Sequence, residues 1–142
     1  MTRITRTLIA MALPIVAFAL APRAAVAQSY TGNRQITETI TGEFKGTYTY
    51  CLALTDNGSE GFPHSGLATL NGDGFTNLQG IFQVVNGLMV ATFYVQSGGG
   101  SLSGLVFVGS ASKGNVGNGF GESVSGAATI TGKLVVGAKG SC

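Results

Sequence analysis

The stretch IFQVVNGLMVATFYVQ, residues 81–96, decides the fold of this chain. Its two apolar runs, Ile81–Val85 and Leu88–Gln96, flank Asn86-Gly87, the preferred dipeptide of a two-residue type I′ turn in a β-hairpin. The turn sets the pairing register, and every second residue then points to the same side. The predicted faces are Phe82, Val84, Met89, Ala91, Phe93 and Val95 on one side, and Ile81, Gln83, Val85, Leu88, Val90, Thr92 and Tyr94 on the other. The second face is mixed but hardly polar, so the hairpin is expected to need cover on both sides.

Similar alternation marks other parts of the chain as strands. It is clearest from Phe44 to Leu54, where aromatic and aliphatic residues share one face with Gly46. Glu38 lies between Ile36 and Ile40 on one face of an earlier strand. Further strands are predicted at Gly66–Leu70, Leu102–Val108, Ser123–Thr131 and Lys133–Val136, whereas residues 28–35 are predicted as a frayed lead-in and residues 109–122 as a glycine-rich loop.

Glycine is abundant in this chain. All 23 glycines lie after residue 27, and each costs about 1 kcal/mol in a helix interior relative to alanine. About eight short strands separated by turn signals, without a helical pattern, indicate an all-β fold. We predict a small antiparallel barrel, with a sandwich as the close second.

The first 27 residues have the pattern of an export signal. Two arginines precede an apolar run from Leu8 to Leu20 that is too short to span a bilayer, and Ala25-Val26-Ala27 fits a signal-peptidase site. We therefore predict a signal peptide over residues 1–27, cleaved after Ala27, and a single all-β domain over residues 28–142. The protein is expected to be periplasmic or secreted, without a membrane span.

The remaining chain is close to neutral. Three of the eight basic residues lie in the leader, which leaves five basic residues against six acidic ones, a net charge of −1. These charges are scattered, so no nucleic-acid surface is expected. Low charge and the second apolar face of the hairpin instead favour a homo-oligomer or a strand-exchanged polymer.

The chain has two cysteines, Cys51 and Cys142. In an exported protein an even pair indicates a disulfide, and closing a loop of about 90 residues stabilises by roughly 4–5 kcal/mol in the chain-entropy model. Unpaired thiols and a bond between two chains are the alternatives. Two cysteines without a neighbouring histidine do not complete a structural zinc site, so no metal or cofactor is expected.

Glu38, Tyr48 and Tyr50 are the candidate ligand-binding residues. The two tyrosines share an apolar strand face and offer flat area with a hydroxyl, although the same properties suit the core, which is the default interpretation. Glu38 is the one acid with apolar neighbours on the same predicted face. An inward carboxylate can hold a polar group of a ligand, but the favoured interpretation is a charge that protects a strand edge against aggregation.

No other residues have the spacing of a catalytic or metal site. His64 is the only histidine and has no local carboxylate or second histidine at ligand spacing, so it is predicted to be a surface turn residue rather than a general base. The segment 114–122 lacks the Gly-Lys-Ser/Thr ending of a phosphate-binding loop and is predicted to be a connection. Asn71-Gly72-Asp73-Gly74 offers one carboxylate, which favours a turn over a calcium site.

These observations favour a non-catalytic exported protein, either an envelope or surface component or a binder of small apolar ligands. A buried group that joins His64 to acidic residues would count against this hypothesis. The alternative is a small barrel enzyme of the isomerase or cyclase kind that acts on an apolar substrate. It requires a dry interior cavity with one buried acid or tyrosine hydroxyl.

Overall fold

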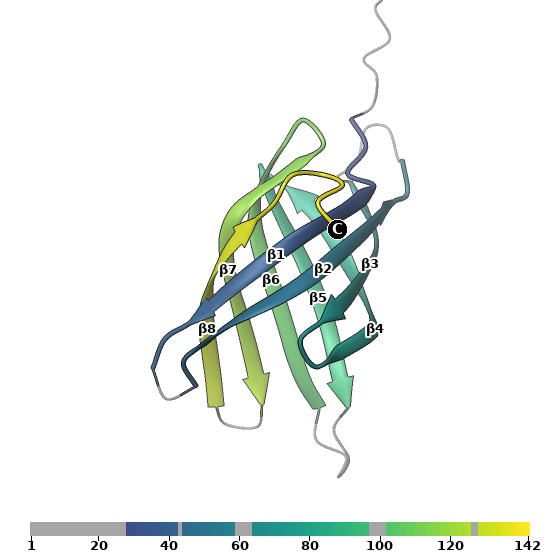
Figure 1. The fold of residues 1–142 in the computed structure, drawn as a ribbon. Coiled ribbons are helices and arrows are strands. Elements are labelled where there is room, and N and C mark those ends of the chain that lie inside the picture. Colours follow the sequence, from purple (N-terminus) through teal and green to yellow (C-terminus); the bar gives the residue numbers. More distant parts are fainter. Residues whose placement is uncertain (1–27, 43, 59–63, 97–101, 126–127) are drawn as a thin grey trace, which may run out of the picture.

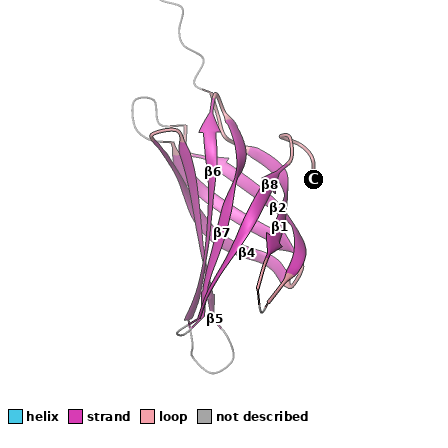
Figure 2. Ribbon diagram, turned by 90° about the vertical axis from the view of Figure 1, so that its left-hand side faces the viewer, coloured by secondary structure: helices cyan, strands magenta, loops and turns pink. Residues whose placement is uncertain are grey.

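The computed structural model describes residues 28–42, 44–58, 64–96, 102–125 and 128–142, and every regular element in them is a β-strand (Figure 2). The predicted signal peptide lies outside these residues. No helix among the described residues is long and apolar enough to cross a membrane. The strands are β1 (Gly32–Ile40), β2 (Gly46–Asp56), β3 (Ser65–Gly72), β4 (Phe75–Val85), β5 (Leu88–Gln96), β6 (Leu102–Ser112), β7 (Asn115–Ser125) and β8 (Ala128–Val136).

The strands form a closed antiparallel barrel (Figure 1). Each strand pairs with its neighbours in sequence, and β8 closes the barrel on β1 from Ile36 opposite Val136 to Ile40 opposite Gly132. In Figure 1, β1 and β2 form the front wall, while β5 and β6 lie behind them. The predicted barrel is confirmed, and the sandwich is excluded.

The hairpin of β4 and β5 forms in the predicted register. Val85 lies opposite Leu88 and Val84 opposite Met89. Asn86 and Gly87 have φ values of 50° and 76°, and a type I′ turn requires positive φ at both central residues. The predicted inner face points into the barrel, whereas on the opposite face Ile81, Val85, Leu88 and Tyr94 are exposed.

The prediction of a loop over residues 109–122 is wrong, because β6 extends to Ser112 and β7 begins at Asn115. The glycines of β7 permit close approach between strands and to the core. A Cβ at Gly119 would collide with the carbonyl of Val108, and one at Gly121 would collide with the Glu38 side chain. Predicting Lys133–Val136 as a separate strand was also wrong, since β8 runs unbroken from Ala128.

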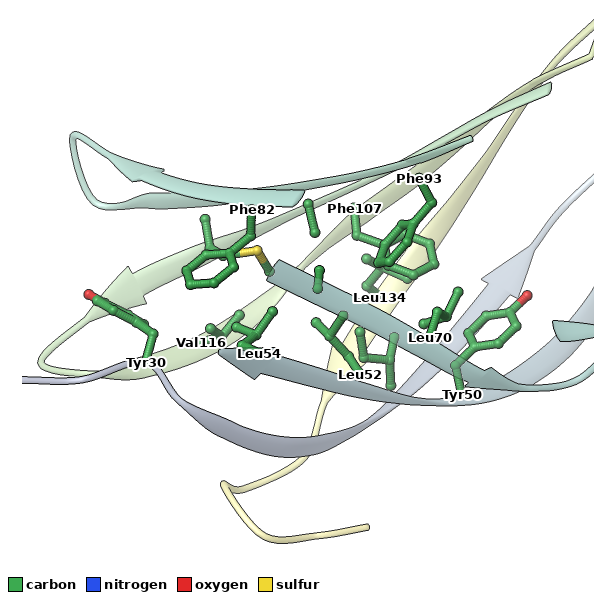
Figure 3. Packing of buried hydrophobic residues seen from close by; sticks show 14 of the residues in the cluster. Tyr30, Tyr50, Leu52, Leu54, Leu70, Phe82, Phe93, Phe107, Val116 and Leu134 are labelled. Carbon is green, nitrogen blue, oxygen red and sulfur yellow. The ribbon is translucent and has the colours of Figure 1, made fainter. Parts of the chain in front are cut away.

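Aromatic and aliphatic side chains fill the interior (Figure 3). Tyr30 and Tyr50 lie at opposite ends of this core, with their hydroxyls pointing away from each other. Phe82 lies toward Tyr30, and Phe93 and Phe107 lie toward Tyr50. Tyr30 is buried and β1 begins at Gly32, so the predicted frayed lead-in over residues 28–35 is wrong.

Cys51 and Cys142 form the predicted intramolecular disulfide, with Cα atoms 5.9 Å apart. The tail after β8 continues along β1, where the amide of Gly137 donates to the carbonyl of Gln35 at 2.8 Å and that of Gly140 donates to the carbonyl of Asn33 at 2.6 Å. The tail therefore extends the closure of the barrel beyond the end of β8. A structural disulfide of this kind is typical of an oxidising compartment.

Candidate functional site

Glu38 points into the barrel. Its side chain comes from β1, opposite Tyr48 of β2 and Leu134 of β8, and the residue is only 4 % exposed. The prediction that Glu38 protects a strand edge is wrong, because β1 is paired on both sides. Glu38 instead has the inward position that the sequence offered as the alternative to the edge role.

Two glycines make room for the Glu38 carboxyl. Gly121 of β7 and Gly132 of β8 lie opposite each other, and a Cβ on either would collide with the Glu38 side chain. At Gly132 the nearest atoms would be Cγ and Oε1 of Glu38, both at 2.7 Å. Three strands are thus adapted to hold one carboxyl inside the barrel.

The Glu38 carboxyl has a single hydrogen-bond partner among the described residues. The Tyr50 hydroxyl donates to Oε2 of Glu38 at 3.3 Å, and no described Lys or Arg forms an ion pair with the carboxyl. Burial raises the pKa of Glu38, and the hydrogen bond from Tyr50 opposes this only in part. Burial and then the adjacent Glu38 also raise the pKa of Tyr50. The pair therefore lies in surroundings that disfavour negative charge.

Aromatic rings surround this pair. The Tyr50 ring centroid lies 5.9 Å from that of Phe75 and 5.9 Å from that of Phe107, and Phe93 and Phe107 are 5.8 Å apart. Tyr48 is partly buried against the same core. The structure thus brings together the three residues predicted as ligand-binding candidates. It confirms the core interpretation for Tyr50, whereas Tyr48 packs against the core while only partly buried.

Sequence reasoning missed Arg34, which is buried at the other end of the barrel. Only 1 % of the residue is exposed. Its Nη1 donates to the carbonyl of Gly32 at 3.1 Å and its Nη2 to that of Gly114 at 3.0 Å, and burial lowers the pKa of its guanidinium. The alternation that placed Ile36 and Glu38 on one face also includes Arg34, so this signal was present in the sequence.

Asp56 and His64 form a second polar pair at the Arg34 end. Oδ2 of Asp56 lies 2.8 Å from Nδ1 of His64 and accepts the amide of Tyr30 at 3.0 Å, while Oδ1 accepts the amide of Gly58 at 3.1 Å. Burial alone would raise the pKa of Asp56, but these hydrogen bonds lower it overall. His64 therefore has a carboxylate partner in space, although the sequence places none at ligand spacing beside it.

The arrangement around His64 fits a structural role. The Asp56 carboxylate joins the segment before β1, the residues after β2 and the residue before β3. The Tyr30 ring packs edge-on against the imidazole, with centroids 5.1 Å apart. Within the part of the chain that the structure describes, no three His, Cys, Asp or Glu residues gather as a metal site would require. Among the described residues, His64 is paired with Asp56 alone rather than with a set of acids.

The predicted turn at residues 71–74 serves to connect strands. The amide of Thr49 donates to Oδ2 of Asp73 at 2.6 Å, and the amide of Asn77 donates to Oδ1 of Asn71 at 2.8 Å. Both side chains thus accept hydrogen bonds from nearby backbone. The turn interpretation is confirmed.

Two hollows lined by described residues lie against the outside of the barrel. One of about 250 Å³ is bordered by Ser65, Leu67, Ile81 and Gln83 on β3 and β4. The other, of about 280 Å³, lies beside the disulfide. Neither is the interior cavity that the enzyme hypothesis requires.

No protein-family model, curated protein or solved structure matches this chain.

Proposed function

We propose that this protein is an exported, non-catalytic binder of a small, mainly apolar molecule that carries one basic amine. The ligand binds at the Tyr50 end of the barrel, with its amine toward Glu38. The observation that carries the proposal is the Glu38 carboxyl, which is buried without a cation partner among the described residues and has one hydrogen bond of 3.3 Å.

A protonated amine supplies what the Glu38 site lacks. A buried carboxylate without an opposite charge is costly, which is why burial raises the pKa of Glu38. An ammonium group beside it provides that charge, and the faces of Tyr48, Tyr50 and Phe75 provide cation–π attraction. The apolar part of the ligand contacts the same rings.

The two ends of the barrel differ in a way that favours entry near Tyr50. At the opposite end, Tyr30, Arg34 and Val116 are all buried. At the Tyr50 end, Tyr48, Phe75 and Val95 pack against the core but are only partly buried. A ligand reaches Glu38 by displacing these side chains rather than by opening a strand pair.

The cellular part of the proposal rests on the disulfide and on the leader. The Cys51–Cys142 bond fits an oxidising compartment. Residues 1–27 are a signal peptide that is removed after Ala27, and the protein works in the periplasm or outside the cell. N-terminal sequencing of the protein purified after export tests the cleavage site, and an intact leader would contradict it.

Calorimetric titration with 1-naphthylmethylamine and with 1-naphthalenemethanol, its neutral analogue, tests the ligand class. We expect the amine to bind more tightly than the alcohol, and Glu38→Gln to weaken the amine at least 10-fold while leaving the alcohol nearly unchanged. Glu122→Gln is the matched control, because Glu122 lies on β7 outside the core cluster. If neither compound binds, the proposed function is wrong. Equal binding of both by wild type and Glu38→Gln would contradict the role of Glu38.

One observation favours a second candidate, the small barrel enzyme. A carboxyl with a raised pKa beside a tyrosine hydroxyl is suited to move a proton in an apolar substrate. Deuterium uptake at the carbon next to the carbonyl of 2-indanone, measured in D₂O, tests it. Protein-dependent uptake that disappears in Glu38→Gln would favour the enzyme, and no uptake above buffer would exclude this reaction.

A further inference from the structure

We propose that the outer face of β3, β4 and β5 is the interface of a symmetric homodimer. We call it the neutral face. This inference does not depend on the ligand proposed above. The face is formed by five apolar side chains that are each 44–66 % exposed: Leu67, Ile81, Val85, Leu88 and Tyr94.

These side chains form neighbouring pairs across the sheet. Leu67 lies opposite Ile81 in the β3–β4 pair, and Val85 lies opposite Leu88 in the β4–β5 pair. Val90 is half-buried on the same outer side of β5 and continues the apolar surface toward β6. Five large apolar side chains that each expose about half of their area form a patch on the order of the roughly 300–600 Å² of the largest patch on a typical monomer, which is often functional.

The neutral face lies on a charge-free part of the chain. Residues 65–72, which form β3, and residues 74–112, which contain β4, β5 and β6, include no Asp, Glu, Lys, Arg or His. On the opposite wall, the outward positions of β1 and β2 are mostly threonines, such as Thr39, Thr47 and Thr49. The outer face of β3, β4 and β5 is therefore apolar and uncharged, whereas that of β1 and β2 is mainly polar.

The absence of charge favours a second copy of this chain as the occupant. In a two-fold interface the same patch meets itself, so a charge near the axis would face an identical charge. The neutral face has no charged side chain, so two copies can meet there without bringing like charges together.

The closed barrel also decides how two copies meet. Every strand is paired on both sides along at least part of its length, and the β4–β5 pairing covers Gly80–Val85 of β4. Because the five exposed side chains project from the outer face of the sheet rather than from a strand edge, the contact is face to face. The hollow of about 250 Å³ beside Leu67 and Ile81 gives apolar side chains of the second copy a place to insert.

Sedimentation velocity from 1 to 200 μM tests the proposal on protein expressed from the full gene and purified after export. We expect a concentration-dependent dimer in wild type and at least a 10-fold weaker dimer in Ile81→Lys. Val135→Lys is the matched control, because Val135 is an exposed apolar residue on β8, away from the neutral face, with 48 % exposure. We expect this variant to dimerise like wild type. Circular dichroism and the melting temperature show whether each variant is folded.

Three results would overturn the proposal. They are a monomer at every concentration, equal dimerisation of wild type and Ile81→Lys, and loss of the dimer in Val135→Lys as well as in Ile81→Lys. If wild type is a monomer, flotation with phosphatidylcholine vesicles shows whether the neutral face binds lipid instead. Should Ile81→Lys not fold, Tyr94→Lys at the other end of the face replaces it.

Discussion

Arg34 and Glu38 point into the barrel from the same face of β1, four residues apart, and they do not form an ion pair with each other. Four residues of extended chain span about 13 Å, and the apolar Ile36 lies between the two side chains. Arg34 bonds to carbonyls at one end of the barrel, whereas Glu38 accepts a hydrogen bond from Tyr50 toward the other. The hydrogen bonds to these carbonyls satisfy the buried guanidinium of Arg34. Among the described residues, the buried Glu38 carboxyl has no comparable set of partners and no opposite charge.

Glu38→Gln should change the pH dependence of stability. A raised folded-state pKa means that the native protein loses stability as the pH rises from the unfolded value, about 4.3, through the folded pKa. The side-chain amide that replaces the carboxyl in this variant does not titrate in this range, so the variant does not lose stability in this way. We therefore expect Glu38→Gln to be the more stable protein at pH 8, by about 1.4 kcal/mol for each unit of elevation, with the difference shrinking toward pH 4. Urea unfolding at several pH values measures it, and parallel profiles for the two proteins would contradict it.

Gly132→Ala should destabilise the protein through its contact with Glu38. The added Cβ would lie 2.7 Å from Cγ and Oε1 of Glu38, and such overpacking costs about 1–3 kcal/mol. In a Glu38→Ala background the contact is gone, so the same substitution should cost much less. A double-mutant cycle with a coupling of about 0.5–3 kcal/mol is expected. Gly104→Ala is the control, since nothing lies within 4 Å of its added Cβ. A cycle without coupling would show that Glu38 does not require the glycine.

Removal of the disulfide should release the tail from β2. Cys51 and Cys142 are separated by 91 residues, and the chain-entropy model gives about 4–5 kcal/mol for a loop of this size. We expect the Cys51→Ala/Cys142→Ala protein to lose most of that free energy of unfolding in urea. If the free energy of unfolding fell by less than about 1 kcal/mol, the hydrogen bonds between the tail and β1 would be enough to hold the C-terminus in place without the disulfide.

Asp56→Asn should weaken the Tyr30 end of the barrel. A lowered folded-state pKa gives stability that is present above the unfolded pKa, about 3.9, and is lost as the pH falls through the folded value. We expect Asp56→Asn to cost about 1–3 kcal/mol at pH 7 and progressively less below pH 4. His64→Ala removes one of the three donors and should cost less. The prediction fails if the effect of Asp56→Asn is independent of pH.

Binding of the amine probe should depend on pH in a direction set by Glu38. The carboxyl must ionise to pair with an ammonium group, and its pKa is raised in the free protein. Affinity for 1-naphthylmethylamine is therefore expected to increase as the pH rises through that pKa, whereas affinity for the neutral alcohol stays flat. Calorimetric titrations from pH 5 to pH 8 measure both. An affinity for the amine that falls over this range would contradict ionic pairing with Glu38.

The local features of this protein follow from its amino-acid sequence alone. Asn86-Gly87 fixed the turn, because it is among the few dipeptides that adopt positive φ twice at low cost. The period-two pattern then fixed which residues of β4 and β5 face inward. The even number of cysteines, in a chain predicted to be exported, indicated the disulfide.

Only the tertiary structure decided the features that depend on contacts between distant segments. Whether Glu38 lies at an edge or inside depends on the pairing of β1 with β8, about 100 residues away, and no local pattern encodes that closure. The strand β7 was not predicted, because a local run of glycines is typical of a loop. In the barrel these glycines instead permit close approach of β7 to Val108 and Glu38. The pairing of Asp56 with His64 likewise arises only when the chain returns to the same end of the barrel. Local backbone preference acts over a few residues, but barrel closure and buried polar contacts depend on which strands meet.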